Sequence, residues 1–75
     1  MRYAVAVFDD FAEEIYLFIV EDITPGNAMV KAITTRWPEI KFSAPYTAES
    51  VKREAFNFYK ELTVTYKEIP DAIAR

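Results

Sequence analysis

The sequence contains no cysteine and no histidine among its 75 residues, and only one glycine. These absences exclude disulfide bridges, zinc sites of the Cys/His type, and catalytic pairs of serine or cysteine with histidine. A single glycine also excludes a glycine-rich phosphate loop and a dinucleotide-binding fingerprint. We therefore expect a protein that is not an enzyme and that uses no cofactor.

Long apolar runs are also missing. No stretch approaches the roughly 20 apolar residues that a membrane-spanning helix needs. The N-terminal segment has neither the apolar centre nor the small-residue cleavage site of a secretion signal. The lack of cysteine fits a reducing compartment. The sequence thus predicts a cytoplasmic protein that does not enter a membrane.

What the chain does have is apolar and aromatic content, at 52% and 16% of its residues. A chain of this length forms one domain, here residues 1–75, and buries only about 60% of its unfolded surface. Small domains usually compensate with disulfides or metals, which this chain cannot use. A dense core is the first alternative, and self-association into a homodimer is the second.

Charge is distributed unevenly along the chain. The net charge is −3, but residues 1–30 carry −5 and residues 31–75 carry +2. Half of the twelve acidic residues lie in the first 22 positions, where only Arg2 opposes them. They are Asp9, Asp10, Glu13, Glu14, Glu21 and Asp22. This pattern predicts two electrostatically different surfaces.

Two apolar runs at the start of the chain, residues 2–8 and 15–20, predict an antiparallel hairpin. In the first run, Ala4 and Ala6 share a face, and their small size favours close packing of a helix there. The second run is apolar on both faces, which a single layer of helices covers only on one side. The connection lacks Gly, Asn and Pro, so a wide acidic loop is expected rather than a tight turn.

Two helices are expected after the hairpin. Thr24 is a favourable cap with Pro25 at the first helical position, and Asn27 is an alternative cap. Pro38 ends this helix near Arg36 or Trp37. Thr47 caps the second helix. Its core stripe, which continues into the last strand, consists of Val51, Ala55, Phe58 and Leu62.

Two further strands are expected, at residues 40–44 and 62–66. The first alternates Ile40 and Phe42 with polar residues and ends at Pro45, and the second ends before Pro70. Residues 71–75 are left as a short tail. The resulting order is β-β-α-β-α-β, or β-β-α-α-β if residues 40–44 form no strand. We expect an α+β domain with a mainly antiparallel sheet and both helices on one face.

The carboxylates near residues 9–14 are oxygen ligands of the kind that Mg²⁺ or Ca²⁺ takes, but their spacing matches no known calcium loop. A solvated turn is the simpler interpretation, and we predict no metal site. The sequence does not decide whether this loop binds a divalent cation.

The leading functional hypothesis is a small non-catalytic protein-binding module, an inhibitor or modulator that docks an acidic hairpin on a basic partner. Such a partner includes a nucleic-acid-binding protein, whose phosphate site the carboxylates would occupy. Aromatic side chains bordered by charge are typical anchors of interfaces. The expected partner-binding residues are Asp9, Asp10, Glu13, Glu14, Tyr16, Phe18, Glu21, Asp22, Phe56 and Tyr59.

Two alternatives compete with this hypothesis. Tyr16 and Phe18 on one sheet face, with Lys52 and Arg53 on the second helix, suggest a nucleic-acid-binding domain. The nearby carboxylates oppose this, because they would repel a phosphate backbone. The surplus of apolar side chains suggests instead a structural subunit of a homo-oligomer.

Overall fold

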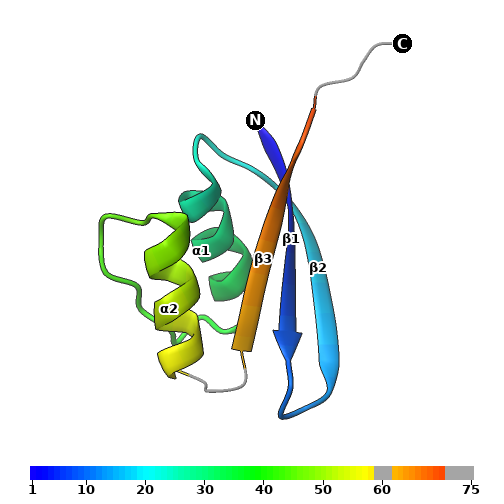
Figure 1. Cartoon of the computed structure of the whole chain (residues 1–75), viewed down its shortest axis with the longest axis vertical. Helices are drawn as coiled ribbons and strands as arrows, with labels where there is room; N and C mark the ends of the chain where they lie inside the picture. Colours follow the sequence, from blue (N-terminus) through cyan, green and yellow to red (C-terminus); the bar gives the residue numbers. More distant parts are fainter. Residues whose placement is uncertain (59–61, 71–75) are drawn as a thin grey trace.

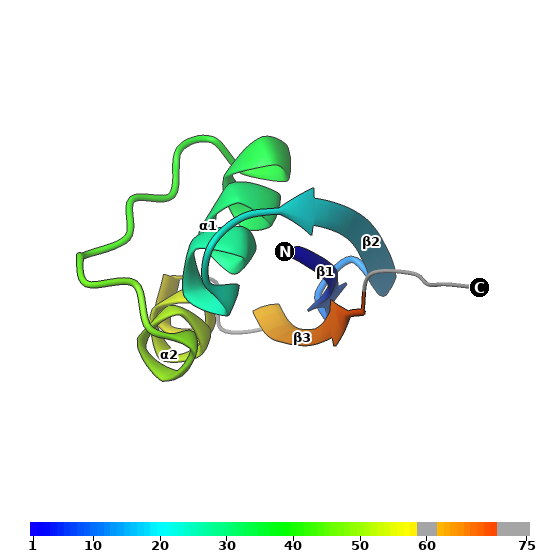
Figure 2. The same cartoon turned by 90° about the horizontal axis from the view of Figure 1, so that it is seen from above.

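The fold is an α+β domain of two layers, as the sequence predicts. The computed structural model describes residues 1–58 and 62–70. Its elements are β1 (Arg2–Asp9), β2 (Glu14–Glu21), α1 (Pro25–Arg36), α2 (Ala48–Phe58) and β3 (Leu62–Ile69). The strands form one antiparallel sheet in the order β2-β1-β3 (Figure 1). Both helices lie on the same side of this curved sheet (Figure 2).

The strand predicted at residues 40–44 is absent, so the order is β-β-α-α-β. Residues 37–47 instead form an irregular connection between the helices. Ile40 is buried and Phe42 is half-buried, so their alternation reflects a segment that covers the core without pairing. The backbone N–H of Ser43 bonds to the Glu54 carboxylate of α2 at 3.0 Å, which holds this segment beside a helix and away from the sheet.

The face of β1 that meets the helices is opposite to the one expected. Tyr3, Val5 and Val7 are buried under the helices, whereas Ala4 and Ala6 lie on the other face. The physical reason is burial: valine and tyrosine side chains remove more apolar surface from water than alanine does. The prediction that a helix packs on the alanine face is therefore wrong.

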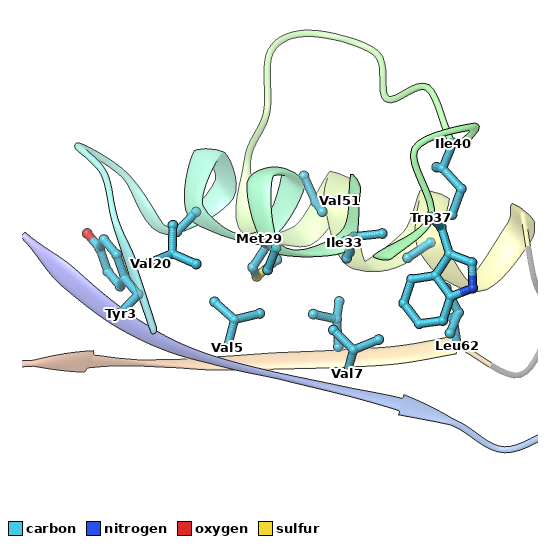
Figure 3. Packing of buried hydrophobic residues seen from close by; sticks show 14 residues of the cluster. Tyr3, Val5, Val7, Val20, Met29, Ile33, Trp37, Ile40, Val51 and Leu62 are labelled. Carbon is cyan, nitrogen blue, oxygen red and sulfur yellow. The ribbon is translucent and has the colours of Figure 1, made fainter. Parts of the chain in front are cut away.

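The core lies between the sheet and the helices (Figure 3). Met29 and Ile33 of α1 point toward Val5 and Val7 of β1, and all four are fully buried. Together with Val51 and Ala55 of α2 and Leu62 and Val64 of β3, they form one apolar cluster. All polar side chains of the described residues are at least partly exposed.

Both predicted helix starts are confirmed. Thr24 accepts a hydrogen bond from the Asn27 N–H at 3.2 Å, and Pro25 follows it at the first position of α1. Thr47 and Ser50 bond reciprocally, each backbone N–H to the other's hydroxyl, at 3.2 and 3.1 Å. Such caps satisfy backbone donors that the first helical turn leaves unpaired.

The last strand also follows the prediction but is longer, since β3 continues to Ile69. Leu62 and Val64 are buried, and Thr63 and Thr65 on the opposite face are exposed. The predicted tail at residues 71–75 lies outside the described part of the chain.

Candidate interaction surface

The side of the sheet away from the helices carries exposed apolar side chains. On β2, the side chains of Ile15, Leu17 and Ile19 are 63%, 77% and 66% exposed. The register places them beside Phe8, Ala6 and Ala4 of β1, respectively. We call these six residues the open face. Isolated apolar residues on a surface are ordinary, but six adjoining ones are typical of an interaction site.

The open face is polar where it continues onto β3. Thr65 lies beside Ala6 and Lys67 lies beside Ala4, and both are exposed. The apolar part is therefore centred on β2, at one edge of the sheet, and is not symmetric across it.

The connection between β1 and β2 borders this face at one end, and we call residues 10–13 the acidic turn. The Asp9 carboxylate accepts a hydrogen bond from the Ala12 N–H at 3.1 Å, which shapes the turn. Glu13 adopts a left-handed backbone conformation with φ of 58°, which is uncommon for a residue other than glycine. Phe11 at its tip is 83% exposed. Asp10 and Glu13 are exposed too, so an apolar ring projects between two carboxylates.

Tyr16 and Phe18, which the sequence suggested as anchors, lie on the covered face of β2 and are half-buried. The Tyr16 ring meets Trp37 edge-to-face at 5.3 Å, and the Arg36 guanidinium lies 5.3 Å from the Tyr16 centroid. The Tyr16 hydroxyl donates to the Glu14 carboxylate. These rings are thus engaged within the molecule and form no open stacking platform.

The Tyr16 contact also affects Arg36. The interaction with the Tyr16 hydroxyl, and secondarily the Glu14 carboxylate, raises the pKa of Arg36 above its usual value. The covered side of β2 near the turn therefore already contains a cation beside its acids.

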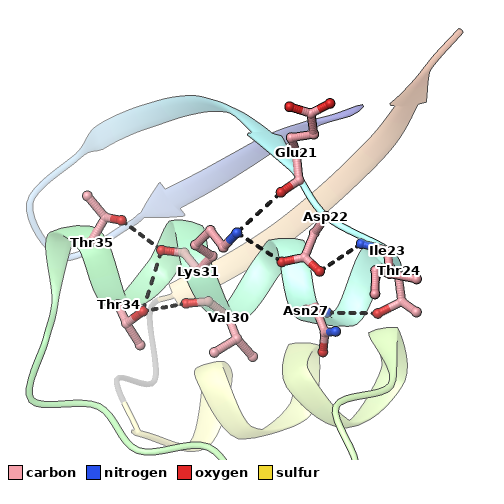
Figure 4. A network of polar contacts seen from close by, with 9 residues as sticks. All are labelled: Glu21, Asp22, Ile23, Thr24, Asn27, Val30, Lys31, Thr34 and Thr35. Atoms are coloured by element: carbon pink, nitrogen blue, oxygen red, sulfur yellow. Dashed lines mark hydrogen bonds and ion pairs between the residues drawn. The ribbon is translucent and has the colours of Figure 1, made fainter. Parts of the chain in front are cut away.

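The other end of β2 is held by a polar network at its junction with α1 (Figure 4). The Lys31 ammonium lies 3.1 Å from the Asp22 carboxylate and donates to the Glu21 carbonyl at 3.2 Å. The Ile23 N–H donates to Asp22 at 2.7 Å. This backbone bond, followed by the bond from Lys31, lowers the pKa of Asp22. Asp22 is therefore a junction residue whose charge is already paired.

The remaining predicted site residues lie elsewhere. Phe56 is 52% exposed on α2, in the helical layer, so the structure does not bring it together with the acidic turn. Lys52 lies 5.6 Å from the Tyr66 ring centroid, and Arg53 is exposed. Tyr59 lies outside the described residues. Assignment of any of these residues to a partner interface stays a prediction.

One depression, of about 310 Å³, lies between the 37–47 connection and α2. Its lining includes Lys41, Ser43, Glu54 and Asn57. Glu54 there already accepts the Ser43 N–H, so its carboxylate holds the connection in place. Over residues 1–58 and 62–70, no three acidic side chains gather closely enough to hold a metal ion.

The sequence alone does not reveal Phe11, Ile15, Leu17 and Ile19 as the exposed apolar group. The pattern of residues 15–20 predicts that one face of this strand needs other cover, but the aromatic rings were the expected anchors on the exposed side. The missing information was the hairpin register, which sets Phe18 beside Val5 and Tyr16 beside Val7. Once Val5 and Val7 belong to the core, the rings must share their face.

None of the helices in the described ranges combines the length and the apolar character that crossing a membrane requires. Comparisons with protein-family models, with curated proteins and with solved structures found no match.

Proposed function

We propose that this protein is a non-catalytic protein-binding module, whose binding surface is the open face together with the acidic turn. The observation that carries the proposal is the exposed column of Ile15, Leu17 and Ile19 next to the turn carboxylates of Asp10 and Glu13, which form no ion pair with any described residue. An apolar centre with a charged rim is the usual composition of a protein interface.

The partner that fits this surface has an apolar patch bordered by basic groups. Its positive charge is attracted over a distance of about a Debye length by Asp10 and Glu13, which accelerates encounter. Binding then covers the β2 side chains and modulates whatever that patch does in the partner. The nucleic-acid alternative has less support, because Tyr16 and Phe18 pack against the core side of the sheet.

The test measures association kinetics of partners captured from the source organism. The double variant Asp10→Lys, Glu13→Lys should lower the association rate constant about tenfold or more at low salt, and should weaken its salt dependence. Asp9 is left unchanged because its bond to the Ala12 N–H shapes the turn. Binding of this variant at an unchanged rate in low salt would refute the role of the acidic turn.

A matched control is Glu68→Lys. Glu68 is exposed on β3, and its register partner is Tyr3, at the opposite end of the sheet from the acidic turn. It changes charge in the same direction as each turn substitution. It is compared with the single variant Asp10→Lys, which changes the net charge by the same amount. A rate that falls as far for Glu68→Lys as for Asp10→Lys would attribute the effect to net charge and not to the turn.

The same proposal places the protein in the cytoplasm, where its lack of cysteine has no cost. Fractionation of source cells with an antibody to the native protein tests this location.

A further inference from the structure

The outer edge of β2 has unused backbone hydrogen-bonding groups. β2 is an edge strand of eight residues without proline, and no helix or strand formed by residues 1–58 or 62–70 lies along its outer side (Figure 1). The Asp22 N–H donates to the Met1 carbonyl at 2.9 Å, which fixes which residues of β2 bond to β1. In an antiparallel ladder these residues alternate, so Val20, Phe18 and Tyr16 bond inward.

The intervening residues Ile15, Leu17 and Ile19 therefore direct their N–H and C=O groups outward. The Glu21 carbonyl agrees with this parity, because it points away from β1 and accepts from Lys31 at 3.2 Å. The same three residues supply the exposed apolar side chains of β2. An added strand would thus gain backbone hydrogen bonds and neighbouring apolar contacts from the same positions.

Charge distinguishes the two ends of this edge. At the end near the acidic turn, Asp10 and Glu13 are exposed and form no ion pair with any residue of 1–58 or 62–70. At the other end, Asp22 is paired with Lys31, and Arg2 lies opposite Glu21 in the register. A basic group on an incoming strand is therefore favoured only at the turn end.

The acidic residues that flank the edge, Glu13 before β2 and Glu21 at its end, argue against a second copy of the chain as the occupant. Antiparallel pairing of two β2 edges centred on Leu17 would set Glu13 opposite Glu21 of the other copy, and twice by symmetry. Like charges directly opposite each other destabilise a strand pair.

We propose that the outer edge of β2 binds an extended segment of another protein, which pairs antiparallel and has alternating apolar side chains. Its basic residues lie at its C-terminal end, because antiparallel pairing sets that end beside the acidic turn. This inference rests on the proposed function and names the binding mode and the chemistry of the partner.

The experiment uses a synthetic peptide as long as β2, with alternating valine and threonine and lysines at its C-terminal end. Hydrogen exchange of the full chain is followed by NMR with and without peptide. At about ten times the dissociation constant, exchange of the Ile15, Leu17 and Ile19 amides should slow about tenfold. The Tyr16 and Phe18 amides, already bonded to β1, should keep their rates. A peptide with its lysines at the N-terminal end should bind more weakly.

Two variants separate the backbone from the side chain. Leu17→Pro removes an outward N–H that the sheet does not use, a position where edge strands tolerate proline. Leu17→Thr retains that N–H and removes the apolar side chain. Leu17→Pro should abolish the pattern in which peptide slows exchange at every second amide of β2. Leu17→Thr should weaken peptide binding but keep that pattern. If Leu17→Pro does not fold, methylation of alternate peptide nitrogens makes the same test on the wild-type chain.

Three results would overturn the proposal: no slowing of exchange, slowing without alternation, or β2 protection by self-association in the absence of peptide. None of these contradicts the proposed function itself. That function fails separately, if captured partners bind the turn variant at an unchanged rate.

Discussion

At the scale of single residues, Gly26 shows how closely the chain packs upon itself. It lies in the first turn of α1 and is buried. A Cβ atom at this position would overlap the backbone carbonyl oxygen of Tyr46 and lie 2.6 Å from its carbonyl carbon. Glycine is therefore required at this position because the 37–47 connection approaches α1 so closely. The backbone conformation of Gly26 does not itself require glycine.

The substitution Gly26→Ala tests this contact. Alanine normally stabilises a helix relative to glycine by about 0.5–1 kcal/mol. Here we expect the opposite sign, a loss of about 1–3 kcal/mol, because the obstructing atoms are backbone and must shift. Urea denaturation measures the change. Thr35→Ala, at an exposed position of the same helix, should stay within about 0.5 kcal/mol of the wild type. A Gly26→Ala variant at least as stable as the wild type would contradict the close approach.

At the scale of elements, both faces of β2 are apolar, but the helical layer covers only one of them. Its inward side chains pack on the helical layer, and its outward ones remain exposed. Ile15, Leu17 and Ile19 therefore contribute little to folding through burial. Ile33 of α1 has the opposite role, since it is fully buried between the layers.

This division predicts two different mutational effects. Leu17→Thr should change the free energy of unfolding by no more than about 0.5 kcal/mol, because the side chain gains little from folding. Ile33→Ala should cost about 2–5 kcal/mol through lost burial and a cavity. Chemical denaturation of both variants at one temperature gives the comparison. A loss above about 2 kcal/mol for Leu17→Thr would show that the open face is covered within the molecule.

The elements differ in how far the sequence predicts them. The helix starts at Thr24 and Thr47 follow from local capping chemistry, and the sequence predicts both correctly. The supposed strand at residues 40–44 depends on a distant partner strand, and alternation alone does not distinguish pairing from simple coverage of the core. The same limit applies to the site. The acidic turn is visible locally, but the exposed face of β2 depends on the hairpin register and on which side the helices lie.

At the scale of the whole molecule, one side is covered by helices and the other is an exposed sheet with an exposed edge. Such an edge can pair with the same edge of another copy, and acidic residues near it oppose that pairing by charge repulsion. Glu13, which directly precedes β2, and Glu21, its last residue, are placed to do so. Homodimer formation stays a prediction from composition, and the charges on β2 disfavour the route through this edge.

Neutralisation of these charges should therefore promote self-association. The double variant Glu13→Gln, Glu21→Gln should increase in average mass with concentration, as measured by sedimentation velocity, more steeply than the wild type. High salt should shift the wild type in the same direction by screening. Glu68→Gln, on β3, serves as the control and should resemble the wild type. A double variant that sediments like the wild type at every concentration would remove repulsion as the cause.

The position of β1 in the sheet has a consequence for the order of folding. β1 pairs with β2, its neighbour in sequence, and with β3, so that Arg2 lies opposite Ile69. A nascent chain can form the β1–β2 hairpin, on the microsecond timescale of such units, long before β3 has been synthesised. Until then, the edge of β1 that faces away from β2 has no partner strand. β3 pairs with this edge, so a chain that stops short of β3 leaves unpaired the backbone groups of β1 that bond to β3 in the folded domain.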